Sequence, residues 1–465
     1  MQKSRRKTFR WQRPGQSRNP PASPARHAAG RMTDHSPAPP SPRSKPSWVL
    51  LDRFVHRSRR RRGVYSGDPT TSATSDDCTG RPVRVSLRSA APPAVSRLYL
   101  HWTGRPPLTN VTDPTAVAAH RHAVLFRLTV PVGDPEWLHA YCCFPVDYFV
   151  YSASPAASPP SLTRLPPCFE GGFVNPMLDK PFRPYRNQQQ RCMMDQDMAI
   201  LCHGDGGEFT VADLTCRSPR EVELCVLHHT PRTSNGIVPM QMRWRVQKIP
   251  VPSDMKIDPS LWTTDAIFPL DGCLCWVDVL LANNDSNSTE HQQLHLAATT
   301  YIDADSPDPF RHVSVTDAGI VKLVCIFTKD SSLSNNFTII TWSFDIRKGS
   351  WTKDCSNTVD DAEFFGMFDA ARSSGLPRVT PSFPVVSLAD PDVVCFMLEE
   401  ELEDHSVYWM IEVNMRNKVL QSTARYMREE EEEGYYPGKP RRKFYGHYFI
   451  PSNFLSYLSQ DGCTR

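Results

Sequence analysis

The sequence predicts an all-β, propeller-like array of antiparallel sheets behind a disordered N-terminal arm. Short segments alternate apolar and polar residues and are separated by turn residues, as half-buried strands are. The 43 prolines among 465 residues, about twice the usual share, disfavour long helices. Three segments also recur with one form, a polar turn before a short apolar run, which is typical of repeated units. Their spacing is irregular, so a β-sandwich or two smaller β domains remain alternatives.

The recurring segments are His203–Asp213, Leu270–Asp278 and Leu388–Phe396. Each is followed by a strand with a tryptophan in or near it, at Trp244, Trp342 and Trp409 respectively. Repeated units of about four strands with aromatic markers suggest propeller blades packed face to face. We expect these tryptophans, with Trp102 and Trp276, to lie mostly in the core.

The predicted strands share an apolar alternation or an apolar run of strand length. They are Val83–Leu87, Arg97–Trp102, Val124–Val130, Tyr148–Ser152, Phe209–Leu214, Val222–Leu227, Trp244–Ile249, Val321–Phe327, Phe337–Phe344, Val393–Leu398 and Tyr408–Val413. Asp360–Arg372 is the best short helix candidate. Order is expected from Trp48, which predicts a domain over residues 47–460.

Charge divides the chain into two regimes. Residues 1–62 hold 17 Lys and Arg against two acids, Asp34 and Asp52, whereas the remainder holds 36 basic and 48 acidic residues. Residues 1–46 are rich in Pro, Ser and Arg and poor in apolar residues, so burial cannot offset the entropy of ordering them. Residues 428–443 join an acidic and a basic run, which predicts an exposed loop.

The basic arm allows a nuclear import signal, a nucleic-acid patch or an organellar transit segment. Lys and Arg bind phosphates without reading bases, and no aromatic stacking platform or zinc finger accompanies them, so sequence-specific recognition is unsupported. No apolar signal core and no run of 18 apolar residues is present, and no membrane partner is expected. We therefore expect a nuclear or cytoplasmic location, with a plastid left open.

The candidate metal ligands have weak spacing. Cys225 with His228 and His229, and Cys273 with Cys275, have no second pair at the spacing that a tetrahedral zinc site needs. The 14 cysteines include no C-x-x-C pair. Buried thiols and surface histidines are the favoured interpretation, and no metal or other cofactor is expected.

Catalytic patterns are equally weak. No Gly-x-Ser-x-Gly string is present, and the turn His203–Gly207 leads into a strand, which favours a β-hairpin over a phosphate cradle. Asp213, Asp278 and Asp392 could work as paired acids if they met in a pocket, but strand-end aspartates more often accept backbone N–H bonds. We predict no catalytic, cofactor-binding or metal residue.

Many segments together resemble one family. They include Trp48–Phe54, Ser96–Trp102, Ala119–Arg127, Tyr148–Ala153, Ile200–Asp205, Phe209–Leu214, Trp244–Lys248, Leu274–Asp278, Thr316–Gly319, Pro384–Ser387 and Trp409–Val413. On these the chain resembles the plant family called domain of unknown function 1618 (DUF1618), expanded in grasses, over residues 47–460. The run Val279–Asn284 departs from the family, which usually continues there with a Gly-containing hairpin.

The resemblance implies a propeller-like fold similar to F-box-associated and kelch-type domains, and it implies no known activity or site residue. The leading hypothesis is a non-enzymatic protein–protein interaction module with an unknown protein partner. A substrate receptor in ubiquitination is one form of it, by fold analogy alone. The alternatives are an enzyme with a pocket on the propeller face and a nuclear nucleic-acid-associated protein that binds through the arm.

Overall fold

The computed structural model describes residues 46–57, 69–102, 114–131, 145–153, 159–170, 189–218, 221–231, 242–251, 262–278, 309–328, 336–373, 375–402, 406–426 and 447–458. The chain divides into two compact units, residues 1–44 and 45–465, and every described residue belongs to the second. The predicted arm at 1–46, apart from Pro46, lies outside the described residues. So do the loop predicted at 428–443 and the run Val279–Asn284.

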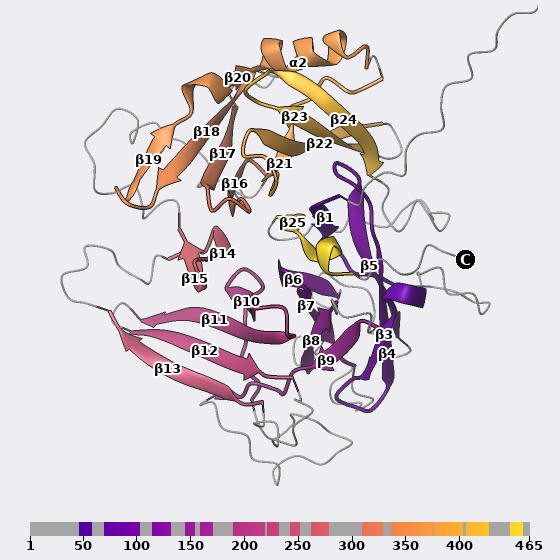
Figure 1. Cartoon of the computed structure of the whole chain (residues 1–465), viewed down its shortest axis with the longest axis vertical. Coiled ribbons are helices and arrows are strands. Elements are labelled where there is room, and N and C mark those ends of the chain that lie inside the picture. Colours follow the sequence, from indigo (N-terminus) through magenta and orange to yellow (C-terminus); the bar gives the residue numbers. More distant parts are fainter. Residues whose placement is uncertain are drawn as a thin grey trace, which may run out of the picture. The chain divides into compact units, whose positions relative to one another are not determined.

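The second unit is built from small β-sheets, as the sequence predicts (Figure 1). The first sheet has the order β25 (Phe449–Ser452), β1 (Val49–Asp52), β5 (Val95–Trp102), β4 (Pro82–Arg88) and β3 (Ala73–Asp76), with β2 (His56–Arg57) also paired to β5. The second contains β6 (Thr115–His120), β7 (Ala123–Thr129), β8 (Val146–Ser152) and β9 (Ser161–Arg164). The third contains β10 (Met198–His203), β11 (Glu208–Ser218), β12 (Glu221–His229) and β13 (Trp244–Pro250).

The second half of the unit repeats this plan. A hairpin of β14 (Ala266–Leu270) and β15 (Cys273–Val277) follows. The next sheet contains β16 (Arg311–Val315), β17 (Val321–Thr328), β18 (Phe337–Asp345) and β19 (Ser350–Lys353), with β20 (Val359–Asp360) paired to β18. The last contains β21 (Ser382–Val386), β22 (Val393–Glu401), β23 (Ser406–Asn414) and β24 (Val419–Tyr426). Short helices are α2 (Asp361–Ala370), η1 (Pro69–Thr71), η6 (Cys355–Asn357) and η7 (Phe454–Tyr457).

We call β6, β10, β14, β16, β21 and, in the first sheet, β25 the first strands of their sheets or hairpin. These strands form a propeller-like ring. Strands β6, β10, β14, β16 and β21 each contact the next, β21 contacts β25, and β25 contacts β6. Strand β25 comes from the C-terminal part of the chain and pairs antiparallel with β1 near its N-terminal part, from Val49↔Ser452 to Asp52↔Phe449. Strands β1 and β2 pair in parallel with β5, and the other pairs within these sheets are antiparallel. The ring is therefore closed by joining the two ends of the unit.

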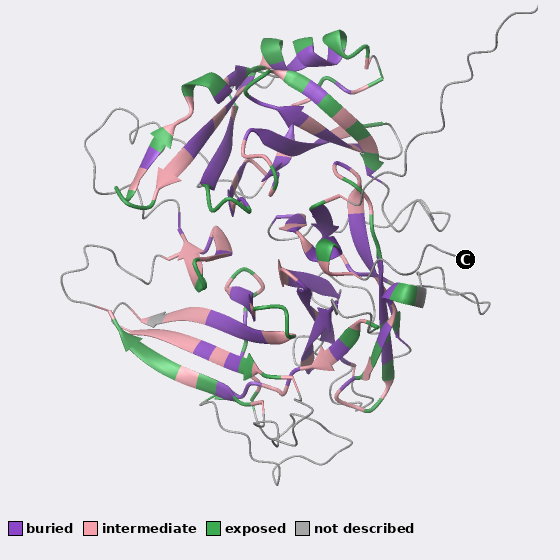
Figure 2. Cartoon of the chain, viewed as in Figure 1, coloured by how far each residue is buried: buried purple, intermediate pink, exposed green. Residues whose placement is uncertain are grey.

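The core lies between neighbouring sheets. One buried cluster joins the first and second sheets through Val85, Phe126 and Ile450, and another joins the second and third through Leu125 and Phe209. Further clusters join the β14–β15 hairpin to the β16–β19 sheet, that sheet to the β21–β24 sheet, and the β21–β24 sheet to the first. The faces between the sheets are the buried parts of the ribbon in Figure 2. Face-to-face packing of the sheets is thus confirmed.

The predicted elements are confirmed where the pattern was strongest. Every strand predicted from alternation is a strand of the structure, and the helix candidate is α2, with Asp360 as its N-cap in a capping box with Glu363. Trp102, Trp244 and Trp342 are buried, whereas Trp276 and Trp409 are half-buried. The sequence missed most of the first strands of the sheets, which are short and carry Pro, His or Arg. Among the described helices, none has the length and apolar character required to cross a membrane.

Candidate functional site

Strands β6, β10, β14, β16 and β25 line a cavity of about 740 Å³. A volume of this size is typical of ligand-binding pockets. Its middle is lined by apolar side chains from β6, β10, β14, β16 and β25, among them Val117, Ile200, Phe268, Val315 and Phe449. The two ends are polar, because the strands run along the cavity and the residues before and after them gather at opposite ends.

The strand-start end consists of Arg53, Asp195, Asp265, His312 and His447. Asp195 Oδ1 lies 2.9 Å from Arg127 Nε. Burial raises the pKa of Asp195, and the nearby guanidinium groups of Arg127 and Arg53 oppose that rise. Asp265 accepts a hydrogen bond from Arg311 Nε at 3.0 Å. The two carboxylates are therefore held by arginines of the fold.

Two histidines stack at the same end. The rings of His312 and His447 lie 4.5 Å apart between centroids. His447 is buried, with Nε2 3.0 Å from the carbonyl oxygen of Pro384, and its Nδ1 lies 3.2 Å from the backbone N–H of Phe449. Burial, helped by the charge of Arg53, lowers the pKa of His447 to about 3. His447 is thus neutral at physiological pH and ties the start of β25 to β21.

The turn end consists of Arg121, Asp271, Asp317, Asn453 and Tyr457. Arg121 has a φ of 48° in the β6–β7 turn and donates from Nη2 to Asp205 at 2.6 Å and from Nε to the Tyr457 hydroxyl at 3.1 Å. Asp317 lies in the β16–β17 turn, and burial raises the pKa of its carboxyl. This end is built from the turns that follow the first strands.

The glycine-rich segment His203–Gly207 is the β10–β11 hairpin turn, as predicted. Strand β10 ends at His203 and β11 begins at Glu208, and Gly204 and Gly207 have φ of 64° and 83°. His203 Nε2 lies 2.6 Å from Thr210 Oγ1, which also lies 2.7 Å from His228 Nδ1. The turn supplies no anion cradle, because a strand and not a helix follows it.

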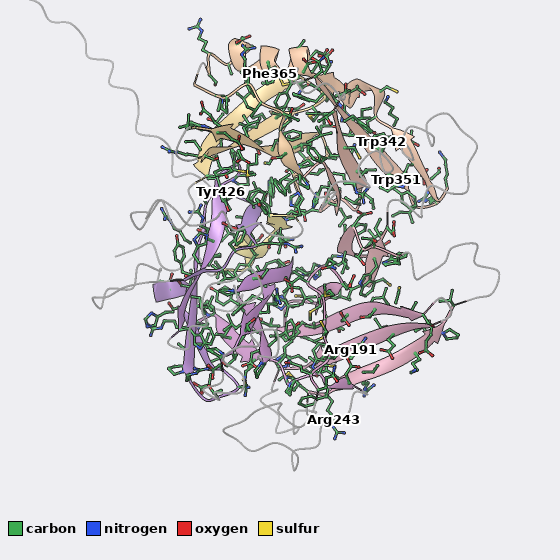
Figure 3. The ribbon with its side chains drawn as sticks, turned by 180° about the vertical axis from the view of Figure 1, so that it is seen from behind. Arg191, Arg243, Trp342, Trp351, Phe365 and Tyr426 are labelled. Carbon is green, nitrogen blue, oxygen red and sulfur yellow. The ribbon has the colours of Figure 1, made fainter. Side chains whose placement is uncertain are left out.

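The three candidate aspartates do not meet in the cavity. Asp278 accepts the backbone N–H of Thr263 at 2.8 Å, as predicted for a strand-end aspartate. Asp213 instead lies inside β11, is fully buried and faces Arg191 at 3.4 Å, and burial raises its pKa to about 6. Arg191 is labelled at the β10–β13 sheet in Figure 3. Asp392 accepts from Asn357 Nδ2 at 3.0 Å and pairs with Arg416 at 3.0 Å. Each of these carboxylates has partners of its own within the fold, and that of Asp392 connects η6 with the β21–β24 sheet.

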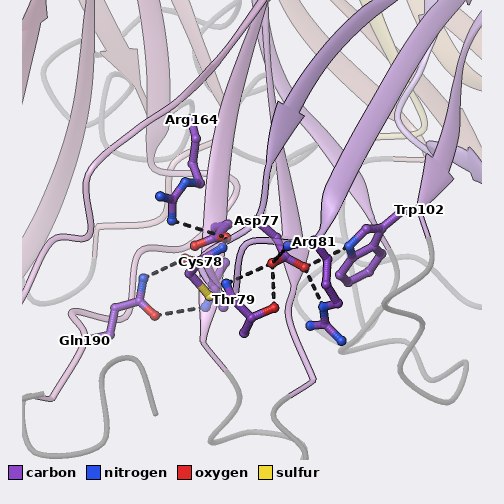
Figure 4. A network of polar contacts seen from close by, with 9 residues as sticks. Asp77, Cys78, Thr79, Arg81, Trp102, Arg164 and Gln190 are labelled. Carbon is purple, nitrogen blue, oxygen red and sulfur yellow. Dashed lines mark hydrogen bonds and ion pairs between the residues drawn. The ribbon is translucent and has the colours of Figure 1, made fainter. Parts of the chain in front are cut away.

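A further polar network lies outside the cavity, at the β3–β4 turn (Figure 4). Asp77 accepts hydrogen bonds from Thr79, Arg81 and the indole N–H of Trp102, which lies 2.9 Å away. The neighbouring Cys78 N–H donates to Asp147 of β8 at 2.5 Å, and Arg164 Nη1 lies 3.9 Å from the same carboxylate. This network joins the first two sheets and is structural.

The thiols form no metal centre among the described residues. Cys225 is buried next to Cys168, and His228 points to Thr210. Cys273 is exposed and Cys275 half-buried on β15. In the parts of the chain that the structure describes, no three His, Cys, Asp or Glu side chains are grouped closely enough to hold a metal ion.

Sequence reasoning did not single out the residues at the strand-start end of the cavity. Asp265 directly precedes β14 and Asp195 lies shortly before β10, so the usable signal was a polar residue ahead of an apolar run. That signal requires knowing that the run is the first strand of a sheet. The short first strands were not predicted, and their ends could not be placed together.

A family model described as "Protein of unknown function (DUF1618)" matches residues 274–395. Over this segment the chain is similar to the DUF1618 family. The DUF1618 segment runs from β15 into β22 and supplies the β16–β17 turn of the cavity. The predicted family is thereby confirmed for this stretch. A search of curated proteins gave no match.

Solved structures give only distant likenesses. They include a GH43_12 protein from a capybara gut metagenome (11% identity, 71% of this chain and 43% of that chain, TM-score 0.21). A mannose phosphorylase, MPT-4 from Leishmania mexicana, is 10% identical over 83% and 91% of the two chains, with a TM-score of 0.16. A PL25 ulvan lyase is 8% identical over 82% and 86%, with a TM-score of 0.21. The chain spans less than half of the first of these proteins, and TM-scores this low carry no argument about function.

Proposed function

We propose that this chain is a non-enzymatic protein-interaction module that holds its partner at the turn end of the central cavity. The observation that carries the proposal is the gathering of the turns after the first strands around one cavity. Turns on a rigid scaffold present side chains without being needed for the packing of the sheets. The family model that matches residues 274–395 is described as a protein of unknown function and assigns no activity to this surface.

The chemistry of the opposite end also favours binding over catalysis. Asp195 and Asp265 each face an arginine, and His447 contacts the backbone through both ring nitrogens. A general base must reach a substrate proton, whereas these groups are oriented by partners in the protein. Their arrangement fixes the starts of the first strands.

Site-specific photo-crosslinking tests the proposal. A photoreactive amino acid at Ile320, which is 38% exposed in the β16–β17 turn, should capture a reproducible protein in an extract of the source tissue. The matched control is the same amino acid at Val419, 50% exposed on the outer strand β24. Capture from Ile320 alone is expected; no reproducible capture, or equal capture at both positions, would contradict the proposal.

A substrate receptor of a ubiquitin ligase is one specialisation of this function, suggested by fold analogy. It requires a second surface that recruits the ligase. Affinity purification with mass spectrometry should then recover ligase subunits both with the full chain and with a form that lacks residues 1–46. Recovery of the captured partner without any ligase subunit would reject this specialisation and leave the interaction role in place.

An enzyme is the second candidate, and one observation favours it. Burial raises the pKa of Asp195 at the strand-start end, where Arg53 and His447 also lie. A carboxyl of this kind can transfer protons. Incubation of the protein with a metabolite extract, compared with the Asp195→Asn variant by mass spectrometry, tests it: a compound consumed only by the unaltered protein would support catalysis, and identical profiles would reject it.

Nucleic-acid association through residues 1–62 is the third hypothesis, and it concerns residues mostly outside the described ones. Basic side chains that neutralise phosphates make binding strongly dependent on salt. Retention on DNA that falls as salt rises and disappears on deleting the arm would support it. Retention that does not change with salt would reject it.

A further inference from the structure

The recurrence noticed in the sequence marks one structural position. Its three segments contain the β10–β11, β14–β15 and β21–β22 turns, each of which follows the first strand of a sheet or hairpin. Each turn carries an aspartate, at Asp205, Asp271 and Asp390, and the β16–β17 turn adds Asp317. The repeated polar residue of the sequence is therefore an acid presented at the turn end of the ring.

Basic residues hardly occur at these turns. Within the described turns that follow the first strands, Arg121 is the one Lys or Arg, and it pairs with Asp205 and Tyr457. Asp271 and Asp317 line the cavity from neighbouring elements, because β14 contacts β16. The side of the cavity mouth formed by the β14–β15 and β16–β17 turns is thus acidic. On the side of Arg121, the positive charge of this residue offsets the negative charge of Asp205.

The local conformation alone does not require this charge. Asp271 has a φ of 48° and Gly272 a φ of 77°, the backbone of a two-residue hairpin turn. Asn-Gly suits such a turn as well as Asp-Gly does. Asp271→Asn therefore removes the negative charge and keeps the turn. The substitution tests the role of the charge in binding without disturbing the fold.

The cavity next to these carboxylates has the lining that a long basic side chain needs. Leu270, Leu274, Val315 and Leu388 line it near Asp271 and Asp317. Farther along β16, Ser314 also lines the cavity, is 5% exposed, and its hydroxyl has no hydrogen-bond partner among the described residues. Lysine and arginine bury their aliphatic stems on apolar surface while the charged head contacts polar groups.

We propose that the turn end of the cavity receives a lysine or arginine side chain from an extended basic segment of a partner protein. The stem packs on Leu270, Val315 and Leu388, and the cationic head lies between Asp271 and Asp317. The inference rests on the proposed function, since it names the class of partner that the same surface holds. Charge complementarity selects this partner over an acidic or an apolar one.

Selection of a random nine-residue peptide library on the full-length protein tests the inference. Peptides that share a Lys or Arg at one position should be enriched, and the Asp271→Asn/Asp317→Asn double variant should bind them at least tenfold more weakly. The control variant, Asp76→Asn/Asp361→Asn, removes two acids from β3 and α2, and should bind them as the unaltered protein does. Thermal unfolding of both variants checks that the fold is kept.

Three outcomes of the peptide selection would overturn the inference: no enrichment, enriched peptides without a common basic residue, or equal binding by the Asp271→Asn/Asp317→Asn variant. The crosslinking at Ile320 decides the proposed function separately. A partner captured there whose binding is unchanged in the double variant leaves the interaction role in place and overturns only the basic-segment inference. If both experiments fail, the proposed function and the basic-segment inference are both rejected.

Discussion

Single residues show how this fold uses buried charge. Asp52 is fully buried at the end of β1 and accepts hydrogen bonds from the Tyr426 hydroxyl at 2.9 Å and the backbone N–H of Phe54 at 3.0 Å. His56 Nε2 lies 3.1 Å from its carboxylate, and Arg97 Nε lies 3.5 Å away. One carboxylate thus connects strands of the first sheet with β24 of the last, at the place where the ring closes.

Asp52→Ala should lower the free energy of unfolding by about 3–5 kcal/mol, because it removes the buried carboxylate that faces the Arg97 charge and accepts the hydrogen bond of the Tyr426 hydroxyl. Urea denaturation followed by tryptophan fluorescence measures the change. Asp76→Ala, an exposed acid on the outer strand β3, should change it by less than about 0.5 kcal/mol. Equal effects of the two substitutions would show that Asp52 is not a connecting residue.

Asp147 should make stability depend on pH. Burial raises its pKa from 3.8 to about 6, so the folded chain binds this proton more tightly than the unfolded chain does. The stabilising contribution of protonated Asp147 to the free energy of unfolding is present below about pH 4 and is lost as the pH rises through about 6. Its size is on the order of 2–3 kcal/mol. Asp147→Asn keeps an acceptor for the Cys78 N–H and lacks the titrating group.

The measurement is the urea midpoint of both proteins at pH 4.5 and pH 7.5. Relative to the Asp147→Asn variant, the unaltered protein should lose stability over this interval. A difference between the two proteins that is the same at both pH values would contradict the assignment. Asp213, whose pKa burial also raises to about 6, stays in both proteins and its contribution cancels in the comparison.

At the scale of elements, the first strands explain why the cavity was missed from the sequence. Strand β14 contains Pro269, β16 begins with Arg311 and His312, and β21 contains Pro384. These residues interrupt the alternation that identifies a half-buried strand. The middle strands, such as β7, β17 and β22, are covered by neighbouring sheets and keep a clear apolar pattern, which is why they were predicted.

Strand β25 is the element on which ring closure depends. Phe449 is 1% exposed, and its ring lies 5.6 Å from that of Tyr426 between centroids. Phe449→Ala should therefore destabilise the fold by about 3–5 kcal/mol through lost burial and the cavity left behind. Val419→Ala, on the exposed outer strand β24, is the matched control and should have little effect on the denaturation midpoint. A small effect at Phe449 would mean that β25 contributes little to the closed ring.

At the scale of the whole molecule, the shared clusters between neighbouring sheets predict cooperative unfolding of the second unit. Trp102, Trp244 and Trp342 are buried in three different sheets, so their fluorescence reports on the ring at separate places. The urea transition seen by tryptophan fluorescence should coincide with the one seen by far-ultraviolet circular dichroism. Two separated transitions would show that parts of the ring unfold independently.

The sequence by itself determined the all-β class, the middle strands, helix α2 and the buried positions of Trp102, Trp244 and Trp342. These follow from local alternation, prolines and capping residues, which act over a few positions. It also revealed three recurring segments with a polar turn, but not that these turns lie at one end of a ring. The tertiary structure alone decided that Asp205, Asp271, Asp317 and Asp390 lie at one end of the ring and that Asp195, Asp265 and His447 lie at the other. That arrangement depends on how separate sheets pack, and residues far apart in sequence carry no local pattern for it.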